Sequence, residues 1–164
     1  ICSVADSHKY RILMGTGKLN QYDAVMKRFA DNGVDTEKYD DITISEYIYN
    51  MDVAMNAADL VISRAGASTL AELTAIGKPA ILVPSPYVTD NHQEHNARAI
   101  ERGGGAAVIP EAELSAKSID AAVSDIVSSK TKLVEMGTNS AKMGVPDSAD
   151  RICREVLRLI GKNK

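Results

Sequence analysis

The sequence predicts an α/β protein whose parallel β-sheet is doubly wound, with helices on both faces. Several short runs are apolar at every position, and segments with helical periodicity separate them along the chain. Strands that are apolar throughout are typical of sheets buried on both faces. Parallel neighbours also need a crossover connection, which is usually a helix. We therefore expect one domain over residues 1–164, without an internal repeat or a dividing linker.

Strands are predicted where short apolar runs end at glycine, proline or polar residues. The run at 10–17 stops at two glycines, and the run at 79–86 is ended by prolines. The predicted strands, some with their exit loops, are 10–17, 43–49, 60–63, 79–86 and 106–110.

Helices are predicted between and after these strands from apolar residues spaced three and four apart. In the first helix Leu19, Tyr22, Val25 and Phe29 share one stripe, and Gly33 follows as a left-handed cap. The predicted helices are 19–32, 51–58, 68–77, 91–102, 115–127, 132–143 and 148–160, with Ser115 as a cap of the fifth.

The composition argues against several classes of protein. A formal net charge of −3 provides no basic surface for a nucleic acid or an anionic membrane. No apolar run approaches the roughly 18 residues that span a bilayer, and the first residues do not resemble a secretory signal, so we expect a soluble protein. Cys2 and Cys153 lie far apart and lack metal-ligand spacing, which predicts reduced, buried thiols in a cytoplasmic protein.

A ligand site is expected at the loops that follow the strands, because doubly wound sheets bind ligands beyond the carboxyl ends of their strands. These loops are 15–18, 46–51, 64–69 and 84–93. The last two are the richest in small and hydrogen-bonding residues, so we expect them to carry the chemistry.

The corner after the strand 60–63 has the features of a phosphate site. Small side chains at Ala65, Gly66 and Ala67 let a ligand approach the backbone, and a helix is expected to start at Ser68 or Thr69. Free backbone N–H groups and the helix dipole favour a phosphate there, with the Thr69 hydroxyl as a further donor. Glu72 lies one turn on and could accept two hydrogen bonds from a ribose diol.

The same spacing has a second interpretation. Thr69 and Glu72 also match a capping box, in which the two side chains satisfy each other's backbone donors and bind nothing. The corner matches neither the GxGxxG nor the Walker A pattern. From spacing alone, a nucleotide site and a simple cap both stay open.

The loop 84–93 concentrates hydroxyls, amides and imidazoles at the end of an apolar strand. Gln93 and Asn96 lie three apart, and their amides can both donate to and accept from sugar hydroxyls. The alternative is that Asn91 caps the helix and the other residues form its wet face. His92 and His95 are a weak metal pair without a third ligand, so we expect no metal and no catalytic histidine.

Four motifs in order, EYIYNM, SRAGASTLAEL, GKPAILVPSP and DNHQEHNA, resemble the C-terminal half of the MurG family of bacterial glycosyltransferases. The resemblance runs over residues 11–160. It implies the GT-B fold, in which two doubly wound domains face each other and the C-terminal one holds the nucleotide-sugar. It also implies transfer of N-acetylglucosamine from UDP-N-acetylglucosamine to a lipid-linked muramyl-pentapeptide, which forms lipid II for peptidoglycan.

The resemblance assigns a role to each residue that matches the family's motifs. The backbone of Ile48 would meet the uracil, with Met51 in the same pocket. Thr69 would bind the diphosphate and Glu72 the ribose, while Arg64 would support the loop or the diphosphate. The other implied contacts are the backbone of Ala67 and Ser68 on the diphosphate, and Gln93, with His92 or Asn96, on the sugar hydroxyls.

The sequence also departs from the family. It lacks the expected Gly-Gly-Ser loop and the first strand before it, and it lacks the N-terminal half with the catalytic base and the membrane-facing patch. We therefore expect a fragment that has no catalytic residue of its own, needs no cofactor and is inactive alone. The whole protein is expected on the inner face of the plasma membrane. In the family the last helix reaches toward the N-terminal half. Here we expect this helix to be exposed or repacked, and to favour dimers.

Three other functions stay open from the sequence. One is a natural short subunit of a two-subunit N-acetylglucosaminyltransferase that acts with a membrane partner, and another is a related glycolipid glycosyltransferase. An interaction module without a ligand is the third. UDP-N-acetylglucosamine 2-epimerases share the fold, but the acid and base motif of their chemistry is not found here.

Overall fold

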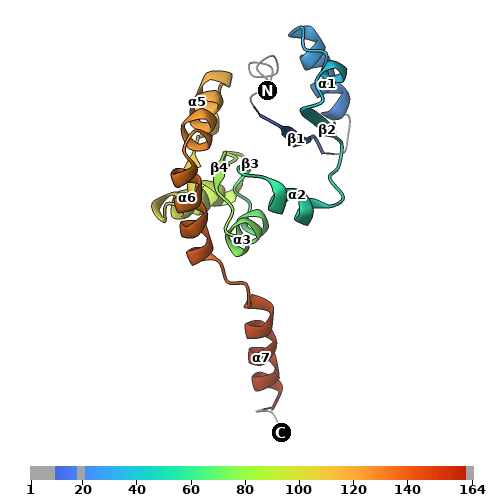
Figure 1. Ribbon diagram of the computed structural model, residues 1–164. Helices are drawn as coiled ribbons and strands as arrows, with labels where there is room; N and C mark the ends of the chain where they lie inside the picture. The colour runs from blue at the N-terminus through green and yellow to red at the C-terminus, as the bar shows by residue number, and fades with distance from the viewer. Residues whose placement is uncertain (1–9, 18–20, 162–164) are drawn as a thin grey trace. The chain divides into compact units, whose positions relative to one another are not determined.

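The computed structural model describes residues 10–17 and 21–161, without the side chain of residue 37 (Figure 1). The chain divides into two compact units, which are Ile1–Ala58 with Ser115–Ser124, and Asp59–Leu114 with Asp125–Lys164. The predictions made for Cys2, Lys18 and Leu19 lie outside the described residues.

The first unit has a two-stranded parallel sheet of β1 (Ile12–Gly15) and β2 (Ile42–Ser45), in which Ile12 lies opposite Ile42. The crossover between these strands contains α1 (Gln21–Asp31) and the short η2 (Thr36–Lys38), and α2 (Met51–Ala57) follows β2. Gly33 ends α1 with a φ of +73°, as predicted. The core of this unit consists of buried Phe29, Val34 and Ile42, with Val25, Tyr39 and Ile44 packed against them.

The second unit has a three-stranded parallel sheet in the order β3-β4-β5. The central strand β4 is fully buried, as its uninterrupted apolar run predicted. The elements of this unit are β3 (Val61–Ser63), α3 (Ala67–Ala75), β4 (Ala80–Leu82), η3 (Thr89–Asn91), α4 (His92–Arg102), β5 (Ala106–Val108), η4 (Glu111–Glu113), α6 (Lys130–Met143) and α7 (Ser148–Gly161).

The α/β class, with parallel strands and helical crossovers, is confirmed. The described strands pair in two sheets, however, where the sequence predicted one. Among the described residues, no strand pairs with both sheets.

The helix at 115–127 starts as its sequence predicted. Helix α5 (Ala116–Val127) follows Ser115, whose hydroxyl accepts a hydrogen bond from the Ser118 backbone N–H at 3.0 Å. The Ser118 hydroxyl in turn accepts one from the Ser115 N–H at 2.9 Å. This reciprocal pair satisfies two donors at the helix end that would otherwise lack partners.

Glycines allow α6 to pack closely against the rest of the second unit. A Cβ added to Gly105 would lie 2.9 Å from the Cα of Ser140, which is buried on α6. Gly77 ends α3 with a φ of +64°, and a Cβ there would lie 3.0 Å from the Cβ of Ala141. These contacts bring the backbone of α6 against both the end of α3 and the turn before β5.

Every described residue of α7 is exposed, although one face of the helix is apolar. Ile152 and Ile160 are 65% and 61% exposed. The exposure expected for this helix is therefore confirmed, whereas dimer formation stays a prediction. The expected burial of Cys153 is wrong, because this free thiol is on α7 and is exposed with it. In the part of the chain described here, no helix combines the length and the apolar character that crossing a bilayer requires.

The close contact at Gly105 predicts a loss of stability when a methyl group is added. Gly105→Ala would force the new Cβ against the backbone of Ser140, at 2.9 Å from Cα and 3.1 Å from N. We expect the free energy of unfolding to fall by about 1–3 kcal/mol, measured by urea denaturation of the chain. Gly161→Ala is the control, because a Cβ there meets nothing within 4 Å. Equal stability of the two variants would contradict the packing.

The ion pair of Asp147 and Arg151 predicts that the stability of the start of α7 depends on pH. A hydrogen bond from Arg151 lowers the pKa of Asp147 below its ordinary value. A carboxyl whose pKa is lower in the folded state stabilises that state at pH values above its unfolded pKa of about 3.9. This stabilisation is lost as the pH falls through the folded-state pKa. Arg151→Gln should raise the Asp147 pKa in a carbon-13 carboxyl titration. Arg158→Gln is the control, since Arg158 pairs with Glu155, and an equal shift in both variants would exclude the assigned cause.

Candidate functional site

The strands of the second unit end level with one another, and this places three exit loops at one edge of the sheet. Ser63 lies opposite Leu82, and Leu82 lies opposite Val108. The backbone continues the ladder one step further, because the N–H of Val83 donates to Ser63 at 2.8 Å and that of Ile109 donates to Leu82 at 3.0 Å. The residues after β3, β4 and β5 therefore leave the sheet together.

Helix α3 begins at Ala67 with Gly66 as its N-cap, one or two residues before the predicted start. The first helical hydrogen bond runs from the Leu70 N–H to the Gly66 carbonyl at 3.0 Å. The N–H groups of the three residues before Leu70 therefore have no acceptor four residues back, and they carry the positive end of the helix dipole. Ala65 is fully buried beneath this turn.

The capping-box interpretation of Thr69 and Glu72 is wrong for this structure. The N-cap is Gly66, which has no side chain to receive a cap hydrogen bond, and Thr69 stands three residues inside it. Within residues 10–17 and 21–161, neither the Thr69 hydroxyl nor the Glu72 carboxylate has a hydrogen-bond partner. Both side chains are thus available to a ligand, on the same face of α3.

The loop between β4 and α4 orients the amide of Gln93. Its Oε1 accepts a hydrogen bond from the Ser85 N–H at 2.9 Å, so Nε2 is left to donate elsewhere. Asn96 is half-buried one turn further along α4. The two amides predicted to contact a sugar are therefore on the first turns of α4, at the same sheet edge as the start of α3.

The end of this loop is conformationally unusual. Asp90 and Asn91 both have positive φ values, 51° and 49°. Asn91 is the N-cap of α4, as the alternative drawn from the sequence had it, but its side chain makes no cap hydrogen bond and its amide donates to Glu94 at 3.0 Å. His92 Nδ1 donates to the Thr89 carbonyl at 2.8 Å. Among the described residues, no three candidate metal ligands lie together, and His92 and His95 belong to no such group.

Arg64 spans the space between the exit loops. Its Nη1 lies 3.3 Å from the carbonyl oxygen of Val83 and 3.4 Å from that of Pro84. The same nitrogen forms an ion pair with Glu111, at the start of η4. The structure therefore places Arg64 against the loop backbone, which corresponds to the supporting role among the two that the resemblance implied.

Ile48 and Met51 belong to the first unit, after β2. The Ile48 side chain packs toward Gly15, where an added Cβ would lie 3.4 Å from it. The rings of Tyr47 and Tyr49 meet edge to face, with centroids 5.0 Å apart. The sequence motifs gave no role to these two tyrosines or to Glu111, although an aromatic residue on each side of Ile48 is a signal for the tyrosine pair.

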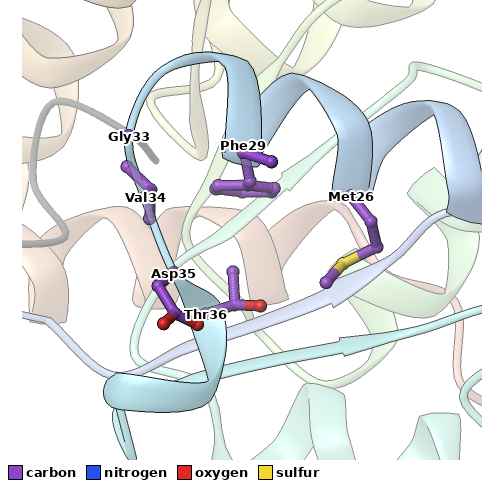
Figure 2. A pocket seen from close by; sticks show the side chains of 7 residues that line it. Met26, Phe29, Gly33, Val34, Asp35 and Thr36 are labelled. Carbon is purple, nitrogen blue, oxygen red and sulfur yellow. The ribbon is translucent and has the colours of Figure 1, made fainter.

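The first unit also contains a hollow of about 390 Å³ beside the C-terminal half of α1, which contains none of the predicted site residues (Figure 2). Figure 2 shows Met26 and Phe29 on α1 above it, with Asp35 and Thr36 at the other side. The lining is Met26, Phe29, Ala30, Gly33, Val34, Asp35 and Thr36. Apart from Asp35 and Thr36, the side chains of this lining are apolar.

The parallel strands, the helix start after β3 and the polar loop after β4 together define an α/β domain of the kind that binds ligands at its strand ends. Comparison with known families then identifies the domain. Residues 3–152 match the model of the glycosyltransferase family 28 C-terminal domain. The chain therefore belongs to this family.

Curated relatives carry one descriptive name, UDP-N-acetylglucosamine--N-acetylmuramyl-(pentapeptide) pyrophosphoryl-undecaprenol N-acetylglucosamine transferase. The protein of Desulforamulus reducens is 42% identical over 159 residues, which are 97% of this chain and 42% of that protein. A Listeria monocytogenes protein is 50% identical over 119 residues, 73% of this chain and 33% of its own length. The chain thus spans less than half the length of these relatives.

Solved structures show the same fold. A crystal structure of Acinetobacter baumannii MurG matches 92% of this chain and 45% of its own chain, with a TM-score of 0.73 and 22% sequence identity. The glycosyltransferase of kitacinnamycin matches 87% of this chain and 42% of its own, with a TM-score of 0.57 and 20% identity. The predicted resemblance to the C-terminal half of a GT-B glycosyltransferase is confirmed at the level of fold and family.

The hydrogen bond of Gln93 predicts that two substitutions at this position differ. Gln93→Glu keeps an oxygen for the Ser85 N–H, whereas Gln93→Ala removes it. Because a hydrogen bond contributes about 0.5–1.5 kcal/mol net, the alanine variant should exchange the Ser85 amide hydrogen roughly three- to tenfold faster than wild type. The glutamate variant should not. Unchanged exchange in the alanine variant, measured by NMR at neutral pH, would mean that the Ser85 N–H does not donate to Gln93.

Proposed function

We propose that this chain is the donor-binding part of an inverting glycosyltransferase that transfers N-acetylglucosamine from UDP-N-acetylglucosamine to the lipid-linked muramyl-pentapeptide, forming lipid II. The observation that carries the proposal is the start of α3, where free N–H groups and the unpartnered Thr69 and Glu72 share a sheet edge with Gln93. The names of relatives that are 42% and 50% identical support the same reaction rather than a two-subunit enzyme or another glycolipid transferase.

In this proposal the second unit binds the diphosphate, ribose and sugar. The N–H groups of Ala67 and Ser68, with the Thr69 hydroxyl, bind the diphosphate, because the positive end of a helix dipole favours anions. The Glu72 carboxylate accepts hydrogen bonds from the ribose diol. The remaining proposed contacts are Gln93, with His92 or Asn96, on the sugar hydroxyls, and Ile48 and Met51 on the uracil.

The proposed contribution to catalysis is electrostatic. In an inverting transfer, the acceptor oxygen bonds to the anomeric carbon, the bond from that carbon to the UDP oxygen breaks, and the acceptor's proton passes to a general base. Charge therefore develops on the departing diphosphate, where the donors at the start of α3 would stabilise it. We assign no base to this chain and no cofactor to the reaction, and we expect the base on the N-terminal part of the full-length enzyme.

The acceptor also suggests where the reaction takes place. A lipid-linked acceptor stays at a membrane, so an enzyme that uses it must reach the surface of the bilayer. We propose that the full-length protein works as a peripheral protein on the inner face of the plasma membrane, in contact with the lipid acceptor through its N-terminal part.

Calorimetric titration of UDP-N-acetylglucosamine into the chain tests the donor site. We expect binding that UDP competes for and a GDP-sugar does not. Glu72→Ala should weaken it by about 10- to 100-fold, since hydrogen bonds to a charged group contribute about 1.5–3 kcal/mol.

The matched control is Glu135→Ala, which removes an exposed carboxylate from α6 in the same unit. This variant should bind as wild type does. The proposal is wrong if the chain binds GDP-sugars equally well, or if the Glu72 and Glu135 variants behave alike. Turnover of the lipid-linked acceptor by the chain alone would contradict the assignment of the base to the N-terminal part.

A further inference from the structure

The loop after β4 contains two carbonyl groups that the sheet does not satisfy. Val83 and Pro84 are both buried, and they follow the last residue of β4. Buried carbonyl groups need a donor, because leaving one unpaired costs free energy. Arg64 supplies that donor to both, at 3.3 and 3.4 Å, from the loop after the neighbouring strand β3.

Glu111 completes this arrangement from the third strand. It follows β5 at the start of η4, and its carboxylate pairs with the same Nη1 of Arg64 that faces the two carbonyls. The Glu111 side chain is 29% exposed and that of Arg64 is 51% exposed. One guanidinium group thus connects the exits of β3, β4 and β5 across the full width of the sheet.

Both predicted ligand-binding helices are attached to these loops within a few residues. Arg64 lies two residues before Gly66, the N-cap of α3. Ser85 follows Pro84 directly, and its N–H donates to Gln93 of α4. A change in the position of Arg64 would therefore reach the start of α3 through the backbone and the amide of Gln93 through Ser85.

We propose that Arg64 and Glu111 form a clamp that holds the three exit loops at a fixed spacing, so that Glu111 is a positioning residue for the nucleotide-sugar site. This inference rests on the proposed function, and it assigns Glu111 a role without contact to the ligand. A partly exposed ion pair adds little to global stability. Its effect is therefore expected in the loops and in ligand affinity rather than in the melting temperature.

Hydrogen exchange of the chain without ligand measures the clamp directly. Glu111→Gln removes the charge of the partner and keeps its shape. We expect the amide hydrogens of residues 64–66, 85, 87 and 88 to exchange about threefold faster or more, with an unchanged melting temperature. Glu113→Gln is the matched control, because it removes the same charge from an exposed residue of the same short helix.

The affinity for UDP-N-acetylglucosamine, measured by calorimetry, separates positioning from a merely structural role. Glu111→Gln should weaken binding by about three- to tenfold, while Glu113→Gln binds as wild type does. Arg64→Lys should retain part of the affinity that Arg64→Ala loses, because lysine still pairs with Glu111 but lacks the guanidinium fork. A parallel fall in melting temperature and affinity would indicate a structural role and overturn the inference.

The outcomes for the clamp and for the proposed function are distinguishable. If wild type binds no UDP-N-acetylglucosamine, the proposed function fails and the positioning role fails with it, whatever the exchange rates. If wild type binds and Glu111→Gln leaves loop exchange unchanged, only the clamp is wrong. Faster exchange in Glu111→Gln with unchanged affinity would mean that the pair orders the loops without positioning the site.

Discussion

The level ends of β3, β4 and β5 are the constraint on which the candidate site depends. Parallel hydrogen bonding sets Ser63, Leu82 and Val108 opposite one another, and the ladder continues by one bond into the loop after β4 and one into the loop after β5. A shift of one residue in this register would turn every side chain of the shifted strand to the other face of the sheet and move the exit loops apart. The start of α3 and the polar loop before α4 meet at one edge because the register is held.

Close packing of α6 against the backbone before β4 and β5 supports this register. Gly77, Gly105 and Gly137 let α6 approach the end of α3 and the turn before β5 at distances that no side chain would permit. The core of this unit is small, and the fully buried Ile81 and Leu82 occupy its central strand.

Several polar contacts to the backbone order the loops. Arg64 satisfies two carbonyls after β4, Gln93 satisfies the Ser85 N–H, and His92 bonds to the Thr89 carbonyl. Asp90 and Asn91 hold left-handed conformations between these contacts. Asp and Asn adopt such conformations more readily than other residues with a Cβ. The Thr69 and Glu72 side chains, which take no part in this network, are the groups free to meet a ligand.

The sequence by itself determined the order of strands and helices, the family and the two loops of the site, because periodicity, end signals and motifs are properties of neighbouring residues. It placed Gly33, Ser115 and the buried run of β4 correctly. It missed the two separate sheets, the early start of α3 and the exposure of Cys153. Only the tertiary structure decided between a cap and free side chains at Thr69, and only it paired Arg64 with Glu111, which lies 47 residues away in the chain. Pairing over such a distance depends on which strands become neighbours, and local sequence does not contain that information.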